Sequence, residues 1–302
     1  MSEPINIDFS SDLTIENLDP LVHKFVGTTE YRNKGPLSPQ HPFRMLIVGA
    51  SSIGKTNTLV NIVMKQVIFD KIYIYLRDQS EDKYEFLFAF LESLQKQYDE
   101  ANETHDKIYE VSSNPEDIVK NEDLDKDIQN LIILDDMVTT KNQKNIEDLF
   151  IRCRKRNASI VYQTQNLFAV PQNIRKNCNY VLLFSTNKRE RKELAKSYAS
   201  DIESKEFETI YMDAISEPFS FMVIDNKTPH KCMRYRKGFD GLLCDPENQP
   251  ENISTSAGKQ DPLPTSSSPT SIYAGKNTSA HAEAFVPIPT KAPKKRKSKL
   301  TT

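Results

Sequence analysis

The feature that most constrains this chain is the segment Gly49-Ala-Ser-Ser-Ile-Gly54-Lys55-Thr56, which matches the pattern G-x-x-x-x-G-K-[ST]. The apolar run Phe43–Val48 precedes it, and Lys55–Gln66 follows with apolar residues at helical spacing. In such a strand–loop–helix unit the glycines allow a tight turn, and backbone N–H groups at the helix start point at a phosphate. The segment therefore predicts a site for the phosphates of a nucleotide.

Two side chains of this phosphate loop have predicted roles of their own. Lys55 is expected to bridge the β- and γ-phosphates of ATP, and the Thr56 hydroxyl is expected to ligate Mg²⁺. Ile53 is bulky where a small residue is usual, so the loop geometry is expected to differ slightly. The other positions expected to contact the phosphates are Gly49, Ala50, Ser51, Ser52 and Gly54.

Strand-like and helix-like segments alternate along the chain. This alternation predicts the α/β class, with a largely parallel sheet covered by helices on both faces. Strands are expected at Phe43–Val48, Lys71–Leu76, Lys107–Val111, Leu131–Leu134, Ser159–Gln163, Tyr180–Phe184 and, as the last, Phe219–Ile224. Helices are expected at Lys55–Gln66, Lys83–Gln97 and Gln143–Lys155, with two more between Lys188 and Met212.

Two adjacent aspartates follow one of the buried strands. Asp135 and Asp136 come directly after the apolar run Leu131–Leu134. We expect this strand to run parallel beside the strand that enters the phosphate loop, so that its carboxylates lie near the metal. Asp135 is then expected to hold Mg²⁺, directly or through a water, and Asp136 to polarise the attacking water.

Polar side chains also follow the strand Ser159–Gln163, which we expect to lie next to the acidic strand. An amide at this strand end can reach the γ-phosphate or the attacking water without adding charge. Gln163 and Gln165 are both candidates for this sensor role.

The end of the chain differs in composition from the rest. Residues 245–302 hold 8 of the 17 prolines, several Ser/Thr clusters, and 8 basic against 5 acidic residues. Few aliphatic side chains are present there to offset the entropy of ordering, so we expect a disordered tail. Its basic run, Pro293–Lys299, predicts a nuclear-import signal or an arm that contacts nucleic acid.

The predicted organisation is a partly ordered segment over residues 1–40, a P-loop domain over 41–244 and the tail over 245–302. The four cysteines are scattered without a C-x-x-C pair, which argues against a disulfide scaffold or a zinc module. No apolar run approaches the roughly 20 residues that cross a bilayer, and the start of the chain lacks the build of a signal peptide. We therefore expect a soluble intracellular protein without a membrane partner.

Several segments, taken in order along the chain, form a pattern: the approach His41–Gly49, the pair Asp135-Asp136, the segment Arg154–Ser159, the pair Thr164-Gln165 and the segment Ile174–Asn177. This pattern resembles that of one family, the poxvirus-type genome-packaging ATPases of the FtsK–HerA superfamily. This family occurs in large DNA viruses and virus-like mobile elements. The resemblance spans roughly Pro42 to Ile224. The chain departs from the family pattern at two positions: Ile53, where the family commonly has a small residue, and Lys155, where it commonly has histidine.

This resemblance implies a RecA-like subunit that forms a homo-oligomeric ring or partial ring and hydrolyses ATP with Mg²⁺ to pull double-stranded DNA into a capsid. It gives the sensor role to Gln165. It also implies that Arg154 or Arg175 acts on the nucleotide of a neighbouring subunit, an effect worth about 10³–10⁵ in rate. A capsid or portal protein is then an expected partner, and the virion or the host nucleus an expected location.

Three other functions share parts of this pattern. The segment Asn187–Glu190 nearly matches the N-K-x-D motif of GTPases, although Glu replaces Asp and Asp135–Val138 lacks the glycine of D-x-x-G. A nucleotide-binding regulatory protein without turnover would carry the same phosphate loop. A non-packaging motor, such as a chromosomal DNA translocase or a transposition helper, would share the chemistry.

Contact with DNA phosphates requires exposed Lys and Arg, and the chain offers three clusters of them. Such contacts do not depend on base sequence, which suits a protein that slides along a duplex. The clusters are Arg152–Arg156, Lys188–Lys196 and Lys227–Lys237.

Overall fold

The computed structural model describes residues 30–243 apart from 104, 138–142, 200 and 229–230. Two compact units divide the chain, Met1–Arg32 and Asn33–Thr302, and every element named below belongs to the second. The predicted tail with its basic run Pro293–Lys299 lies outside the described residues. The domain limits at 40 and 244 therefore stay predictions.

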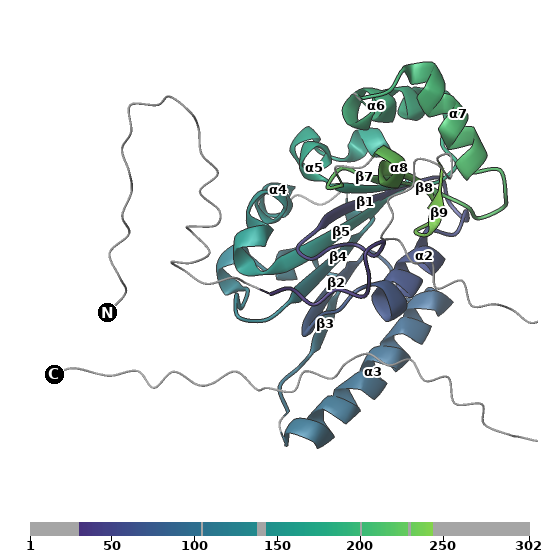
Figure 1. The fold of residues 1–302 in the computed structure, drawn as a ribbon. Coiled ribbons are helices and arrows are strands. Elements are labelled where there is room, and N and C mark those ends of the chain that lie inside the picture. The colour runs from purple at the N-terminus through teal and green to yellow at the C-terminus, as the bar shows by residue number, and fades with distance from the viewer. Residues whose placement is uncertain (1–29, 104, 138–142, 200, 229–230, 244–302) are drawn as a thin grey trace, which may run out of the picture. The chain divides into compact units, whose positions relative to one another are not determined.

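The described strands form one nine-stranded sheet in the order β3-β2-β4-β5-β1-β6-β7-β8-β9 (Figure 1). Neighbours from β3 to β6 are parallel, and those from β6 to β9 are antiparallel. The strands are β1 Arg44–Val48, β2 Lys71–Leu76, β3 Tyr109–Ser112, β4 Asn130–Asp135, β5 Ala158–Thr164, β6 Tyr180–Leu183, β7 Met222–Asp225, β8 Tyr235–Lys237 and β9 Gly241–Leu242.

Helices connect the strands. A single π-helical turn, Ile62–Gln66, continues α2, and short 3₁₀ turns occupy Pro115–Asp117, Asn121–Asp123, Cys153–Arg156 and Leu167–Ala169. The α-helices are α2 Lys55–Asn61, α3 Asp82–Asn102, α4 Gln143–Arg152, α5 Gln172–Asn177, α6 Lys188–Tyr198, α7 Ser204–Ala214 and α8 Lys231–Arg234.

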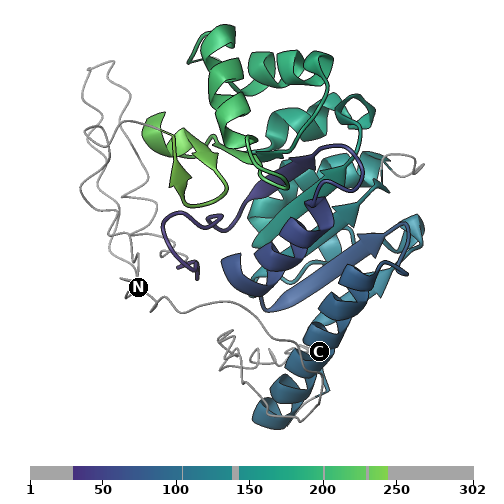
Figure 2. The ribbon, with the colours of Figure 1, turned by 90° about the vertical axis from the view of Figure 1, so that its right-hand side faces the viewer.

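Both faces of the sheet are buried because successive strand residues point to opposite sides and helices cover each side (Figure 2). In β1, Met45 and Ile47 join one core with residues of α2 and α3. Leu46 and Val48 join the other core, with residues of α4 to α7. This arrangement explains why the parallel strands read as unbroken apolar runs.

The predicted α/β class with a mainly parallel sheet is confirmed. Two details of the prediction are wrong. The acidic strand β4 does not lie beside β1, because β5 lies between them and pairs with both. The strand β7 is not the last, because β8 and β9 extend the sheet beyond it. Within the described ranges, no helix has the length and apolarity needed to cross a bilayer.

Candidate nucleotide site

The carboxyl ends of β1, β2, β4 and β5 meet at one edge of the sheet, since these strands are parallel. The segments that follow these strands surround a cavity of about 1060 Å³, which is large enough for a nucleotide. Its polar lining includes Ser51, Ser52, Lys55, Thr56, Arg77, Asp78, Glu81, Tyr84, Asp135, Asp136, Gln163 and Gln165.

The phosphate loop turns sharply between β1 and α2. Ser52 (φ 60°) and Gly54 (φ 99°) both adopt left-handed backbone conformations, which glycine tolerates without a steric penalty. A Cβ on Gly49 would lie 2.4 Å from the Ile53 Cδ1 and 2.6 Å from the Phe184 Cβ. The bulk of Ile53 is therefore accommodated over a glycine.

Lys55 lies within the loop and is almost fully buried, with 7% of its surface exposed. Its ammonium group donates a hydrogen bond to the Ala50 carbonyl at 2.6 Å. Burial lowers the pKa of Lys55, and the nearby Asp135, Asp136 and Glu81 oppose that effect. A phosphate at this loop would therefore meet a cation that is already desolvated and held by the backbone.

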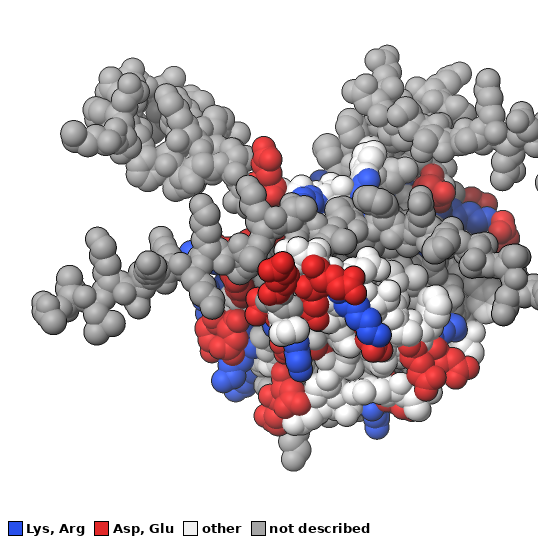
Figure 3. Space-filling view, turned by 90° about the horizontal axis from the view of Figure 1, so that it is seen from below, with Lys and Arg blue, Asp and Glu red and all other residues white. Residues whose placement is uncertain are grey.

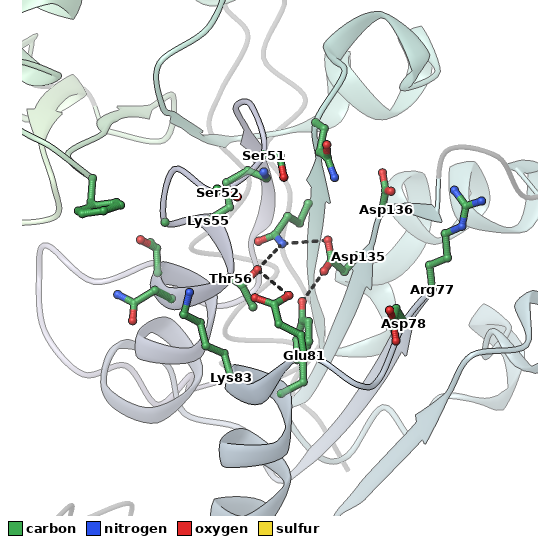
Figure 4. A pocket seen from close by; sticks show the side chains of 17 residues that line it. Ser51, Ser52, Lys55, Thr56, Arg77, Asp78, Glu81, Lys83, Asp135 and Asp136 are labelled. Atoms are coloured by element: carbon green, nitrogen blue, oxygen red, sulfur yellow. Dashed lines mark hydrogen bonds between the residues drawn. The ribbon is translucent and has the colours of Figure 1, made fainter.

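Asp135 stands at the centre of a polar network beside Thr56 (Figure 4). The Tyr84 hydroxyl donates to its Oδ2 at 2.5 Å, and the Gln163 Nε2 donates to its Oδ1 at 2.9 Å. Thr56 makes two longer contacts, from Gln163 Nε2 at 3.5 Å and to Glu81 Oε2 at 3.4 Å. Burial raises the pKa of Asp135 to about 6, although the hydrogen bonds from Tyr84 and Gln163 act to lower it.

Asp136 lines the same cavity one residue further along. Its backbone is left-handed, with φ 54°, and its amide donates to the Gln163 carbonyl at 3.1 Å. The structure thus brings the phosphate loop and both predicted aspartates to one cavity, although the aspartates come from a strand that is not adjacent to β1.

Both candidate glutamines line the cavity, but their surroundings differ. Gln163 pairs in register with Asp135 and is buried, and its Oε1 has no hydrogen-bond partner among the described residues. Gln165 is exposed. Gln163 therefore contacts Asp135 and Thr56 directly, whereas Gln165 lies at the exposed margin.

The sequence did not single out the residues that follow β2. Leu76 pairs in register with Asp135, so Arg77 and Asp78 leave the sheet beside the acidic strand. Glu81 follows directly before α3, and Tyr84 lies in its first turn. The available signal was a polar stretch after a parallel strand. This stretch alone could not predict a place in the site, because the sequence does not reveal that β2 and β4 are neighbours.

The two predicted arginines do not lie in this cavity. Arg154 precedes β5 and Arg175 precedes β6, so both lie at the amino ends of the parallel strands, opposite the phosphate loop. Arg175 is held by contacts within its own subunit: its Nε donates to the Val170 carbonyl at 3.1 Å, and its guanidinium lies 3.4 Å from the Glu193 carboxylate. Arg154 is exposed and has no ion pair with any described residue.

The basic clusters also differ in how accessible they are. In the cluster Lys227–Lys237, Arg236 is 1% exposed and lies 3.4 Å from Asp225, while Lys237 pairs with Glu217 at 2.7 Å. These ion pairs belong to the fold, so Arg236 and Lys237 do not form an open cationic surface. In the cluster Lys188–Lys196, by contrast, Lys188, Arg189, Lys192 and Lys196 surround a second hollow beside Phe168.

The near-match to a GTPase motif has a local explanation. The Asn187 side chain caps α6 by accepting from the Glu190 amide at 3.0 Å, and it donates to the Glu190 carboxylate at 2.9 Å. The other Glu190 oxygen accepts from the Leu167 amide at 3.1 Å. Asn187 and Glu190 are thus used in a helix cap, and neither lines the nucleotide cavity.

The donor set beside the loop fits Mg²⁺. Within the described ranges, no group of three or more His, Cys, Asp or Glu side chains is arranged to hold a metal. Mg²⁺ does not require one, because it commonly takes one or two carboxylates together with waters and substrate phosphates. The Thr56 hydroxyl, the Asp135 carboxylate and the unpaired Gln163 Oε1 supply the oxygen atoms that such an ion and its waters prefer.

Comparison with solved structures gives only weak likenesses. The genome packaging NTPase B204 from Sulfolobus turreted icosahedral virus 2, in complex with AMP, is 10% identical, with a TM-score of 0.42 over 63% of this chain and 95% of that chain. B204, the DNA-packaging ATPase from Sulfolobus turreted icosahedral virus, is 15% identical, with a TM-score of 0.42 over 62% and 95%. Because these scores are below 0.5, they do not support an assignment.

Comparison of sequences is more informative. Among curated proteins none matches. The family described as Poxvirus A32 protein matches residues 33–218, which is more than half of the chain and contains the phosphate loop, the aspartates and both glutamines. The resemblance found in the sequence is thereby confirmed, and the chain belongs to the poxvirus A32 protein family.

Proposed function

We propose that this protein is an ATP-hydrolysing motor that translocates double-stranded DNA and packages a viral or virus-like genome into a capsid. Membership of the poxvirus A32 family supports this proposal. The observation that carries it is the cavity in which Lys55, Thr56, Asp135 and Gln163 converge, because this set combines a phosphate cradle with oxygen donors for a metal.

Each residue of the cavity has a distinct part in the proposed hydrolysis. Lys55 neutralises charge on the β- and γ-phosphates, and Thr56 with Asp135 would hold Mg²⁺, which supplies further charge neutralisation when bound. Asp136 polarises the attacking water. We assign the sensor role to Gln163 rather than Gln165, because Gln163 already contacts both Thr56 and Asp135.

The proposed active form is a ring. Arg154 and Arg175 lie at the opposite edge of the sheet from the cavity of their own subunit, so either would reach a nucleotide only in a neighbouring subunit. Arg154 is the better of the two predicted candidates to act on a neighbouring subunit. It is exposed, whereas Arg175 is held by Glu193 and the Val170 carbonyl.

The proposed DNA contact is the basic face of α6. Lys188, Lys192 and Lys196 recur every four residues and therefore share one side of the helix. The face formed by α3 and β3 is unsuited to phosphates, since residues 82–112 carry eight acids against three lysines (Figure 3). A capsid or portal partner and a location in the virion or nucleus follow from the packaging role.

Turnover by site variants tests the enzymatic part of the proposal. Lys55→Ala should abolish nucleotide binding or turnover, and Asp136→Asn should retain binding while hydrolysis slows. A comparison of ATP with GTP separates the motor from a GTPase switch. If the parent protein hydrolyses no nucleotide in any oligomeric state, the proposed function is wrong and a nucleotide-binding regulatory role takes its place.

A further inference from the structure

One cavity residue has no part in the chemistry above. Phe219 lies in the connection between α7 and β7 and lines the nucleotide cavity with 70% of its surface exposed, which is the largest exposure among the large apolar residues described. An aromatic side chain this open loses most of the hydrophobic stabilisation that burial would give it. Packing within the subunit therefore does not explain its position.

The backbone at Phe219 is also unfavourable for a bulky residue. The Ser220 amide donates to the Glu217 carbonyl at 3.2 Å, which closes a turn with Pro218 at its second position and Phe219 at its third. Phe219 has φ 65°, a conformation that this turn position normally reserves for glycine or asparagine. Strain of this kind persists where the surrounding structure enforces it, and it is concentrated at ligand sites.

Contacts from Lys237 and Gly238, at the end of β8, hold this turn in place. The Lys237 ammonium lies 2.7 Å from the Glu217 carboxylate and donates to the Ser216 hydroxyl at 3.3 Å. The Gly238 amide donates to the Phe221 carbonyl at 2.9 Å, and the Phe221 ring packs on Phe184 with centroids 5.0 Å apart. The strained aromatic is thus positioned by β8 before any ligand arrives.

The position within the cavity indicates what Phe219 would contact. A Cβ on Gly54 would lie 3.4 Å from both the Cβ and the Cδ1 of Phe219, so this side chain lies against the phosphate loop at Gly54. The carboxylates instead gather around Thr56, where the γ-phosphate and metal belong. The other end of a nucleotide, its base, is a planar π-system that stacks well on an aromatic ring.

We propose that Phe219 is the stacking platform for the nucleobase of the bound nucleoside triphosphate. This inference rests on the proposed function, since it presumes that the phosphate loop holds a nucleotide. Base–aromatic stacking tolerates every base, so Phe219 provides affinity, while any preference for adenine comes from other groups.

The test compares ATP with inorganic tripolyphosphate, which has the phosphates but no base. In the full-length protein, Phe219→Ala should weaken ATP binding between about fivefold and a hundredfold, the range that base stacking provides. Tripolyphosphate binding should not change. Phe219→Tyr should bind ATP as the parent does. Phe86→Ala, at an aromatic that is 60% exposed on α3 and outside the cavity, is the matched control and should leave both affinities unchanged.

A stability measurement separates binding from a structural role. Phe219→Gly suits a φ of 65° and removes little packing, so it should weaken ATP binding without lowering the Tm. The inference fails if the parent binds ATP and tripolyphosphate equally well, or if Phe219→Ala weakens both ligands alike. If the parent binds neither, the proposed function itself fails.

Discussion

The Asp135 carboxylate accepts hydrogen bonds from Tyr84 and Gln163, yet its pKa stands at about 6 rather than 3.8 because burial outweighs both bonds. A raised carboxyl pKa means that the folded protein binds this proton more tightly than the unfolded chain does. Without a cation at the site, folding stability should therefore decrease as the pH rises from about 4 to 6, and the full cost should remain above pH 6.

Asp135→Asn is expected to remove that cost. In EDTA at pH 8 the variant should be more stable than the parent, by up to roughly 3 kcal/mol, and at pH 4 the two should be nearly equal. Urea unfolding at the two pH values measures the difference. Equal stabilities at pH 8 would show that the Asp135 carboxylate is not destabilised by burial.

The two glutamines give a second prediction at the scale of single residues. Gln163→Ala removes the amide that contacts Asp135 and Thr56, so turnover should fall by at least about tenfold while ATP binding is largely kept. Gln165→Ala, at the exposed neighbour in the same segment, is the matched control and should retain most activity. The reverse result would return the sensor role to Gln165.

Among the elements, α6 has the charge pattern that best suits a duplex. Replacing Lys188, Lys192 and Lys196 with glutamine should weaken binding of linear duplex DNA and reduce the slope of log K against log salt by about three. The ATPase rate without DNA should not change. Glutamine at Lys96, Lys107 and Lys126, which lie elsewhere, provides a charge-matched control. An unchanged salt slope in the α6 variant would exclude this helix from the interface.

The elements also show what the sequence could reveal. The phosphate loop and the pair Asp135-Asp136 were recognisable because each depends on a local pattern: an apolar strand followed directly by the polar residues. Glu81 and Tyr84 were not, because the contact of Tyr84 with Asp135 and that of Glu81 with Thr56 depend on β2 lying beside β4. Strand order is set by long-range packing. The sequence pattern correctly placed β5 beside β4, but it did not reveal that β5 also pairs with β1 and so separates β1 from β4.

The strands β8 and β9 were not predicted, for a different reason. They are short, and in sequence Arg236 and Lys237 resemble a solvated basic cluster. Arg236 is buried because its terminal NH groups donate to the carbonyls of Leu37 and Phe239 and to the carboxylate of Asp225, and of these groups Leu37 is far away in sequence. Without those partners an arginine there would be exposed, as the pattern suggested.

At the scale of the whole molecule, a trans-acting Arg154 requires two subunits to complete one site. Arg154→Ala alone should lose at least about 10³ in turnover, and Lys55→Ala alone should be inactive. Mixing the two should restore activity, because roughly a quarter of the interfaces in a randomly mixed ring pair an intact cavity with an intact arginine.

The control for this mixing experiment is Arg175→Ala, which removes contacts to Glu193 and Val170 within its own subunit. This variant should lower the Tm but retain turnover without a partner. If a mixture of Arg154→Ala and Lys55→Ala stays inactive while each variant assembles normally, Arg154 does not act across the interface.

The central claim is that one nucleotide cavity drives movement of duplex DNA, and the steady-state rate of ATP hydrolysis tests it most directly. The rate per subunit should be measured with and without linear duplex DNA over a range of protein concentrations. The account predicts that the rate rises with DNA and with protein concentration, and that Lys55→Ala abolishes it under all conditions. A rate that is indifferent to both DNA and concentration would contradict the account.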